Sequence, residues 1–382
     1  MKATIVPLST VLTQDTASVL VQPDQTYRSA GILNRGRGLF DKGDLAGADT
    51  SYKSLFPIKA GQAIYSKLFG WEGAVTTVSA DFDGSFMSSE FPHFDVDQTT
   101  INSAYLDHYL KSPVFAELLA TAGSGLGQRR QRVNVGTFLA LPVPIPSRTD
   151  QDRIAAHLDS LAEPMSRAAQ SADRATGLLD LLREHVLGGL VEGGLMPLQT
   201  VLRQIDGLED VGPEKEYSTL GVRSFGRGAF ASGSVLGSET AYKKLRRFEA
   251  GQVCYPKLMA WQGAFAVIPD ELDGYFASPE FVGFEVDQTL TSSEYVGHCL
   301  RWSAFAAGAE SASTGTNANR RRLQPNDFLS LSFPLPARNV QDAISAALSM
   351  ATAATAKARV VAGLAAATLS AARNDVFASP QP

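Results

Sequence analysis

Lysine and arginine side chains occupy two sets of matched positions in this 382-residue chain, beside glycines and aromatic residues. Arg37 lies between two glycines, and Arg227, 190 residues further on, does the same. Lys67 and Lys257 each stand in the pattern Tyr-x-Lys-Leu-x-x-Trp. Because a glycine-flanked backbone can approach a phosphate closely and cations neutralise it, this chemistry fits the binding of an extended anion.

Two arginine clusters extend the pattern, each just after a loop rich in Gly, Ser and Thr. Arg129, Arg130 and Arg132 match a second cluster at Arg320, Arg321 and Arg322. The planar guanidinium fork suits phosphate contact and the recognition of guanine. A lone cluster would be read as solvated surface, but recurrence in the same register favours binding. For the aromatic partners Trp71 and Trp261, packing in the core is at least as good an interpretation.

These matches belong to one long internal repeat without insertions or deletions. Segments starting at Tyr27, Tyr52, Asp83 and Gln128 return at Tyr217, Tyr242, Asp273 and Ala318. The period is far longer than the roughly 20–50 residues of solenoids and propellers, so each unit should be a whole domain. We therefore predict two copies of one domain.

Composition is that of a globular chain, with 44% hydrophobic and 19% charged residues. A net charge of −5 gives no global case for nucleic-acid binding, so any such case must be local. No run approaches the ~20 apolar residues of a membrane span, and the first residues do not resemble a secretory signal, so we expect a cytoplasmic protein. Cys254 and Cys299 have no counterparts in the other copy, which argues against a zinc cluster or a disulfide framework.

Catalytic motifs do not meet their context requirements in this sequence. The chain has no P-loop, HExxH or GxSxG pattern, and its GRG segments lack the third glycine of a dinucleotide fingerprint. The acids that recur are Asp83/Asp273, Asp97/Asp287 and Glu90/Glu280. The first pair precedes glycine in turns, and a structural role is also favoured for the glutamates. We predict no catalysis and no metal.

Each copy is expected to be α+β up to a proline-rich exit. Short β-rich stretches with turn signals come first, followed by a helical segment over 103–121 or 293–311. After the prolines, Thr149 or Asn339 resembles an N-cap with an aspartate three residues later, which predicts a long helix. We predict a target-binding domain at 1–148, a helix at 149–192, a second domain at 193–338 and a helix at 339–378.

Both long helices carry an alanine-rich heptad seam. The seam positions are Ile154, Leu158, Leu161, Met165, Ala168, Ala172, Ala175, Leu179, Leu182 and Val186 in the first helix, and Ile344, Leu348, Ala351, Thr355, Ala358, Ala362, Ala365, Leu369, Ala372 and Val376 in the second. We predict that the helices pair as an antiparallel coiled coil with pseudo-twofold symmetry, separating the domains like a ruler. The alternative is that each helix folds back onto its own domain.

The order of these features resembles the specificity (S) subunit of type I restriction-modification systems, over almost the whole chain and twice. The features are Y-x-x-x-G-x-x-x-x-G-x-G, Y-x-K-L-x-x-W-x-G-A, S-x-E-F-x-x-F, a glycine-rich arginine loop and F-L-x-L-x-x-P-x-P before a Q-D-x-I helix. The helix entry is often Glu-Gln in that family but is Asp150-Gln151 and Val340-Gln341 here.

The resemblance implies two β-rich target-recognition domains that each read half of a split double-stranded DNA site. It implies that the helices bind two methyltransferase subunits and, through the complex, restriction subunits. S-adenosylmethionine, ATP and Mg would be bound by those partners, and this chain would hold no cofactor and have no activity of its own. The partner-binding positions expected on the helices are Ile154, Leu158, Leu161, Leu179, Leu182, Ile344, Leu348 and Leu369.

Positions identical in both copies should be scaffold or sequence-blind contacts, whereas exposed positions that differ are candidates for base reading. Such pairs are Glu72 with Gln262, Asn34-Arg35 with Ser224-Phe225, and 127–129 with 317–319. The full predicted DNA-binding set is Arg35, Arg37, Lys67, Trp71, Gln128, Arg129, Arg130, Arg132, Arg227, Lys257, Trp261, Asn317, Asn319, Arg320, Arg321 and Arg322. A tandem protein- or carbohydrate-binding module is the alternative, and a stand-alone nuclease or methyltransferase is disfavoured by the missing motifs.

Overall fold

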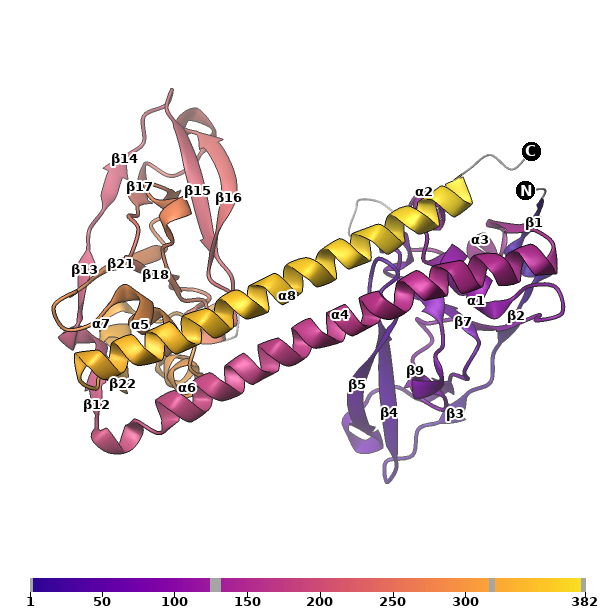
Figure 1. Ribbon diagram of the computed structural model, residues 1–382, viewed down its shortest axis with the longest axis horizontal. Coiled ribbons are helices and arrows are strands. Elements are labelled where there is room, and N and C mark those ends of the chain that lie inside the picture. Colours follow the sequence, from indigo (N-terminus) through magenta and orange to yellow (C-terminus); the bar gives the residue numbers. More distant parts are fainter. Residues whose placement is uncertain (1–2, 124–131, 316–319, 379–382) are drawn as a thin grey trace. The chain divides into compact units, whose positions relative to one another are not determined.

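The computed structural model describes residues 3–123, 132–315 and 320–378, and its chain forms two compact units (Figure 1). Unit 1 comprises Met1–Gln170 together with Val360–Pro382, and unit 2 comprises Ser171–Arg359. Unit 1 therefore combines the first part of the chain with its last helical turns.

Unit 1 has a β-rich body with two larger sheets, of strand order β2-β10-β7-β8 and β3-β6-β9-β4-β5, and a β1-β11 pair. Most neighbours are antiparallel, but β4 and β9 run parallel. The strands are β1 (Thr4–Pro7), β2 (Leu12–Asp15), β3 (Val19–Leu20), β4 (Thr26–Ile32), β5 (Leu39–Ala46), β6 (Ser54–Pro57), β7 (Ala63–Tyr65), β8 (Val75–Thr77), β9 (Phe86–Met87), β10 (His93–Val96) and β11 (Pro142–Ile145).

Unit 2 repeats this architecture, with sheets β13-β21-β18-β19 and β14-β17-β20-β15-β16 and a β12-β22 pair. Its strands are β12 (Leu195–Pro197), β13 (Leu202–Ile205), β14 (Leu208–Asp210), β15 (Glu216–Val222), β16 (Ala229–Leu236), β17 (Lys244–Arg247), β18 (Val253–Pro256), β19 (Ala266–Val267), β20 (Phe276–Ala277), β21 (Phe281–Val286) and β22 (Ser332–Pro334).

The segment expected to be one helix in each copy is broken into two. In unit 1, α1 (Ser103–Leu110) is followed by α2 (Pro113–Ala122), because Pro113 cannot continue a helix and instead starts a new one. Unit 2 breaks at the same place without a proline, between α5 (Ser293–Cys299) and α6 (Ser303–Ala312). Short helices α3 (Val135–Leu139) and α7 (Pro325–Ser330) complete the bodies.

Stacked aromatic rings fill the core of each body. In unit 1 the rings of Tyr65 and Phe138 have centroids 4.1 Å apart, and Phe94 and Phe138 are 5.4 Å apart. The corresponding rings of unit 2 form the same cluster with tilted planes, Tyr255 lying 4.6 Å and Phe284 4.9 Å from Phe328 between ring centroids. These side chains are fully buried, so the repeat in sequence is a repeat in packing.

The long helices are α4 (Arg148–Gly188) and α8 (Arg338–Ala378), each a continuous ribbon in Figure 1. The predicted N-caps are wrong, because both Thr149 and Asn339 lie inside a helix. The Ser147 hydroxyl accepts a hydrogen bond from the amide of Asp150 at 3.2 Å, and Ala337 occupies the cap position of α8. The aspartates meant for capping boxes pair instead with Arg148 and Arg338.

A buried glutamine attaches the start of each long helix to its own body. Gln151 is 1% exposed, donates to the carbonyls of Thr100 (3.2 Å) and Pro146 (3.0 Å), and accepts from the Asn102 amide at 2.7 Å. Gln341, also 1% exposed, donates to the carbonyls of Leu290 (3.1 Å) and Pro336 (2.8 Å) and accepts from the Thr291 hydroxyl at 2.7 Å. The Gln in Q-D-x-I is thus a structural clamp.

The last turns of each long helix pack in the opposite unit from its first turns. Near the end of α8, Phe377 is 8% exposed in the core of unit 1, with ring centroids 5.5 Å from Tyr105 and 5.3 Å from Tyr109. Near the end of α4, Leu187 is fully buried in the core of unit 2. Each unit therefore contains the start of one helix and the end of the other, running antiparallel. The predicted antiparallel seam is confirmed, and the folding-back alternative holds only for the first turns.

Across the described ranges, no helix combines the length and apolar character that a membrane crossing requires.

Candidate nucleic-acid interface

The glycine-flanked arginine of unit 1 lies in the tight turn between β4 and β5. Arg35 and Gly36 have positive φ values of 60° and 63°. Their amides donate to the carbonyls of Glu72 (2.9 Å) and Gly73 (2.8 Å), so the turn is fastened to the loop that follows β7. Arg37 is exposed, and its Nε donates to a carbonyl within the turn. The turn is rigid where it holds its cation.

Unit 2 builds the same turn between β15 and β16. The amides of Phe225 and Gly226 donate to the carbonyls of Gln262 (2.8 Å) and Gly263 (3.0 Å). Arg227 is exposed at the position of Arg37.

Lys67 and Arg132 both bond to Glu90, the lysine through its backbone amide and the arginine through its side chain. The Lys67 amide donates to the Glu90 carbonyl at 2.9 Å, and the Val133 amide donates to the Lys67 carbonyl at 3.0 Å. Arg132 donates to the Glu90 carboxylate at 2.7 Å. Glu90 therefore positions the arginine, which accounts for this acid without catalysis.

Unit 2 has the same connections. The Lys257 amide donates to the Glu280 carbonyl at 3.0 Å, and the Leu323 amide donates to the Lys257 carbonyl at 3.1 Å. Arg322 donates to the Glu280 carboxylate at 3.3 Å. Both ion pairs are largely exposed, so they orient the arginines more than they stabilise the fold.

The structure thus joins most described site residues into one loop cluster per unit. We define the loop cluster as residues 33–38, 67–73, 89–90 and 132–133 in unit 1, and 223–228, 257–263, 279–280 and 320–323 in unit 2. It contains Arg35, Arg37, Lys67, Trp71, Arg132, Arg227, Lys257, Trp261, Arg320, Arg321 and Arg322. Gln128, Arg129, Arg130, Asn317 and Asn319 lie outside the described residues.

The two tryptophans are partly buried and do not belong to the aromatic cores. The Trp71 indole donates to the Leu68 carbonyl at 2.9 Å. The Arg321 guanidinium lies 5.4 Å from the Trp261 ring centroid and donates to the Glu310 carbonyl at 2.6 Å. Among the described residues the buried Trp261 Nε1 has no hydrogen-bond partner.

Two of the differing pairs of positions contact each other. Asn34 donates to the carboxylate of Glu72 in unit 1. In unit 2 the corresponding Ser224 donates to the side-chain oxygen of Gln262 at 3.0 Å. Two of the positions predicted as candidates for base reading are therefore hydrogen-bonded to each other in both units.

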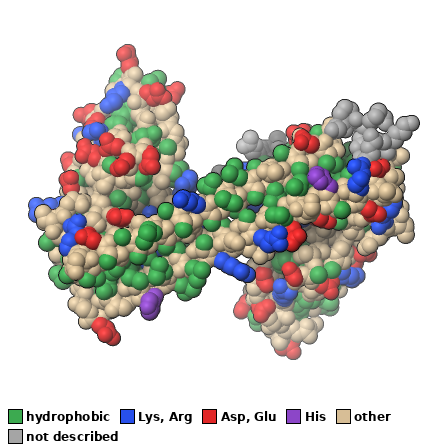
Figure 2. Space-filling view, in the orientation of Figure 1, with side chains coloured by type: hydrophobic (Ala, Val, Ile, Leu, Met, Phe, Trp, Pro, Cys, Tyr) green, Lys and Arg blue, Asp and Glu red, His purple; other side chains and the backbone are tan. Residues whose placement is uncertain are grey.

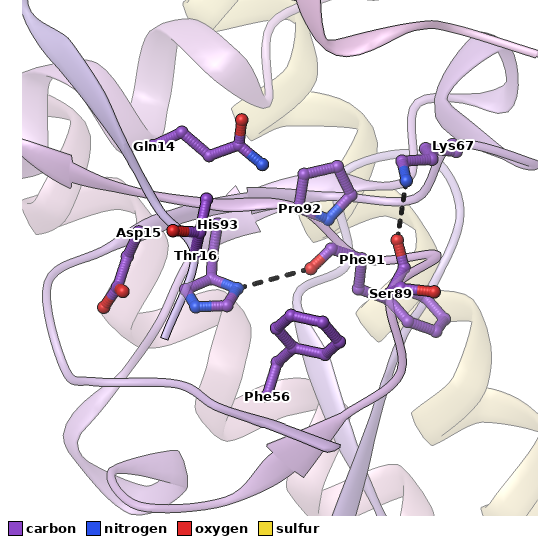
Figure 3. A pocket seen from close by; sticks show the side chains of 9 residues that line it. All are labelled: Gln14, Asp15, Thr16, Phe56, Lys67, Ser89, Phe91, Pro92 and His93. Carbon is purple, nitrogen blue, oxygen red and sulfur yellow. Dashed lines mark hydrogen bonds between the residues drawn. The ribbon is translucent and has the colours of Figure 1, made fainter. Parts of the chain in front are cut away.

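A pocket of about 110 Å³ borders the loop cluster of unit 1 (Figure 3). Its lining residues are Gln14, Asp15, Thr16, Phe56, Lys67, Ser89, Phe91, Pro92 and His93. Lys67 donates to the Ser89 carbonyl at 2.7 Å, and His93 Nε2 is buried without a partner among the described residues. Hydrogen bonds from the Ala17 amide and from Lys59 lower the pKa of Asp15 to about 2, so this carboxylate is ionised and paired with Lys59 at 3.0 Å.

Unit 2 has a buried arginine at a position that lines this pocket in unit 1. Arg246 stands where unit 1 has Phe56, is 7% exposed, and donates to the carbonyls of Phe281 and Ile205, each at 2.9 Å. The two units therefore differ beside otherwise matching loop clusters.

One recurring group was missed by the sequence analysis: a histidine and an arginine where the end of a long helix meets a body. In unit 1 His108 contacts Asp159 of α4 at 2.9 Å and accepts from Arg373 of α8 at 3.2 Å. In unit 2 His298 and Arg183 occupy the same repeat positions, and both are buried. Their shared spacing of 190 residues was the available signal.

Several predicted partner-binding residues lie inside the units rather than on their surface. Ile154 and Leu158 belong to the core of unit 1, and Leu179 and Leu348 are buried in unit 2. Leu161, Ile344 and Leu369 are partly buried, and Leu182 is exposed. The buried seam residues are not free to contact another protein, whereas Leu182 is accessible at the surface.

The exposed apolar surface lies beside the seam, as Figure 2 shows along the visible face of α4 and α8. In unit 2, Leu178 (66% exposed), Leu181 (67%) and Met350 (70%) adjoin a groove of about 180 Å³. The groove is lined by Leu182, Val186, Ala343, Ile344, Ala347 and Leu348. We call the groove, together with the exposed Leu178, Leu181 and Met350, the leucine face. Unit 1 exposes Val360, Val361 and Leu364 of α8.

Comparison of this chain with family models and with curated proteins gives no match. Three solved structures resemble it along nearly the whole length. A type I restriction-modification S subunit from M. genitalium has a TM-score of 0.55 at 12% identity, covering 99% of this chain and 96% of its own. A structure described as bearing on complex assembly and conformational transition of the type I R-M system has a TM-score of 0.51 at 16% identity, covering 98% and 97%.

The third, the HsdS subunit from Thermoanaerobacter tengcongensis, has a TM-score of 0.41 at 16% identity, covering 99% and 97%. The fold comparison rests on the first two. Their coverage includes both bodies and both long helices, so the likeness is not confined to one repeat. The chain therefore has the fold of the S subunits of type I restriction-modification systems.

Proposed function

We propose that this chain is the DNA-recognition subunit of a type I restriction-modification complex. Each unit binds one half of a bipartite double-stranded DNA site, and the helices dock methyltransferase subunits. The main observation behind this proposal is that each unit contains the same loop cluster, with cations on hydrogen-bonded turns, in a fold shared with S subunits. A tandem protein- or carbohydrate-binding module does not require cations at matched positions.

The chemistry of the loop cluster supports DNA as the ligand. Arg37 and Arg227 are exposed on turns fastened by backbone hydrogen bonds, which suits sequence-blind phosphate contacts. The positive charge of the loop clusters is a local feature, since the chain as a whole carries a net charge of −5. Positioned cations on an acidic protein favour binding at these loops over binding elsewhere on the surface.

The leucine face supports docking of a protein partner. Leucine and methionine side chains that are two-thirds exposed flank an apolar groove between two helices. Contiguous exposed apolar surface is typical of protein–protein contact. We assign methyltransferase docking to this face and to Val360, Val361 and Leu364, and we propose that methyl donor, ATP and Mg bind to the partners.

The test is a selection from random double-stranded DNA with the full chain co-expressed with the methyltransferase encoded beside it. We expect a two-part motif with a fixed gap. A Leu181→Asp variant should lose co-purification of the methyltransferase, and the exposed Arg153→Ala variant should retain it. A folded, assembled complex that enriches no sequence would refute the DNA-recognition function and favour the protein-binding alternative.

A further inference from the structure

Phe225 stands at the tip of the turn in the loop cluster of unit 2 with a backbone conformation that a phenylalanine rarely adopts. Its φ is 61°. Among the described residues other than glycine, positive φ is found only at Phe225 and at Arg35, which occupies the same position in the first copy. A side chain with a Cβ is disfavoured in this left-handed region, and a bulky one there is an outlier.

The surrounding loops impose this conformation. The Phe225 amide donates to the Gln262 carbonyl at 2.8 Å, and the next amide, Gly226, donates to the Gly263 carbonyl at 3.0 Å. Arg301, which follows α5 in the chain, donates from Nε to the Gly226 carbonyl at 3.1 Å. Strained residues held by several independent contacts cluster at functional sites, where the strain presents a side chain.

The ring that this conformation presents is not used for packing. Phe225 is 73% exposed, although it is one of the largest apolar side chains in the chain. The nearby Arg223 guanidinium packs 4.0 Å over the ring centroid of Phe230 instead. A lone exposed apolar residue is ordinary, but exposure together with an enforced unfavourable φ is not.

We propose that Phe225 is a wedge that inserts at a base step of the half-site bound by unit 2 and unstacks it. This inference rests on the proposed DNA-recognition function. Arg35 presents a cation at the matching place in unit 1, so the two half-sites are read by different means. An apolar side chain inserted into a step kinks the duplex, and a ring already fixed by its backbone loses little freedom on binding.

The test uses the full chain in complex with its methyltransferase and the duplex recovered by selection. 2-Aminopurine replaces each adenine in turn, and its fluorescence reports loss of stacking. The wild-type complex should raise the fluorescence at one step of the half-site bound by unit 2. Phe225→Asn keeps a residue that tolerates positive φ, so the fold should survive with an unchanged or higher Tm. It should abolish the signal and weaken DNA binding roughly 5- to 150-fold, the range for loss of one base–aromatic stack.

Arg35→Asn is the matched control, because it makes the same replacement in the other unit. It should lower affinity and salt dependence while leaving the fluorescence in the half-site of unit 2 unchanged. Unchanged fluorescence and affinity in Phe225→Asn, with normal wild-type binding, would overturn the wedge alone. A loss of affinity without wild-type unstacking would also overturn it, in favour of a groove contact with a thymine methyl. Failure of the wild-type complex to bind any duplex would overturn the proposed function and the wedge together.

Discussion

At the scale of single residues, this chain separates side chains that hold a loop from side chains that the loop presents. Glu90 and Glu280 orient arginines, whereas Arg37 and Arg227 project from turns that backbone hydrogen bonds fasten to the neighbouring loop. Lys67 belongs to both kinds, since its ammonium donates to the Ser89 carbonyl beside the pocket. Charge alone therefore does not identify a ligand contact.

Arg37→Ala should weaken binding to every DNA sequence by a similar factor. Within the described part of the chain, the Arg37 side chain donates one hydrogen bond, from Nε to the Asn34 carbonyl at 3.1 Å, so its loss removes a cation without dismantling the turn. We expect the slope of log affinity against log salt to fall by about one. Titrations of the selected duplex and of unrelated DNA at several salt concentrations measure this. A loss confined to one base pair would contradict a phosphate role.

His298 should make the stability of unit 2 depend on pH. Burial, followed by the charges of Arg301 and Arg183, lowers its pKa to about 4, and Glu294 opposes this shift. The imidazole Nε2 lies 3.0 Å from the Ser349 hydroxyl. Because the folded pKa is below the ordinary value near 6.5, folding favours the neutral ring. This stability is complete above pH ~6.5 and is lost as pH falls towards 4, by up to roughly 3 kcal/mol.

Denaturant unfolding of the full chain between pH 7.5 and 4 measures the effect. The His298→Asn variant keeps a neutral polar group and should show a shallower decline in unfolding free energy over that range. The His298→Gln variant provides a second check if the first is poorly folded. Parallel declines in the variants and the wild type would mean that other groups carry the pH dependence.

The sequence predicted the residues of the loop cluster better than their partnerships. Arg37, Lys67 and Arg132 could be found because each recurs beside an invariant local pattern. That Glu72 pairs with Asn34, and Gln262 with Ser224, depends on contacts between segments far apart in the chain, which spacing does not encode. The positive φ of Phe225 likewise results from tertiary hydrogen bonds.

At the scale of elements, the long helices were predictable and their ends were not. A heptad pattern is local, so it predicted the antiparallel seam of α4 and α8, although Leu182 of the pattern is exposed and the buried Leu187 and Phe377 lie outside it. Neighbouring hydroxyl side chains can each serve as the N-cap, and at α4 the cap is Ser147 rather than Thr149. The break between α1 and α2 follows from Pro113, but the same break before Ser303 depends on Glu184 of α4, which accepts from the Ser303 amide at 2.9 Å.

Gln151→Ala should destabilise unit 1 more than the shortening of one polar side chain usually does. The buried amide makes three hydrogen bonds, and its loss leaves the Asn102 amide and two carbonyls without their partner. We expect a loss of roughly 2–4 kcal/mol in the free energy of unfolding. Denaturant unfolding measures this. Gln170→Ala, at an exposed position on the same helix, is the control and should change little. Equal effects of the two variants would contradict the clamp.

At the scale of the whole molecule, two copies of one architecture differ in and beside their loop clusters. Phe56 lines the pocket beside Lys67 in unit 1, whereas unit 2 has Arg246 at that position, bonded to the Phe281 carbonyl. Arg35 and Phe225 occupy matching turns with opposite chemistry. The bodies can thus diverge at their loop clusters while the aromatic cores and helix clamps remain the same.

Removing one heptad from each long helix, 165–171 and 359–365, should shorten the gap between the half-sites without changing either half-site. These segments face each other in the antiparallel register indicated by the contact of Thr355 with the Ala175 carbonyl. A heptad spans roughly 10 Å of helix, or about three base pairs of DNA. Selection from random DNA with the shortened chain measures the new gap. An unchanged gap would refute the proposal that the helices set the spacing.

The sharing of the long helices between the units also has a consequence during synthesis. The core of unit 1 contains Leu8 near its beginning and Phe377 near its end, so the two meet only after nearly the whole chain has left the ribosome. Domains usually fold one after another as they emerge. The body of unit 1 is translated before α8, so Tyr105 and Tyr109 lack their contact with Phe377 until α8 has been made. If translation stalled before α8, the nascent chain would expose apolar core surface of unit 1, and a chaperone would be needed to cover it.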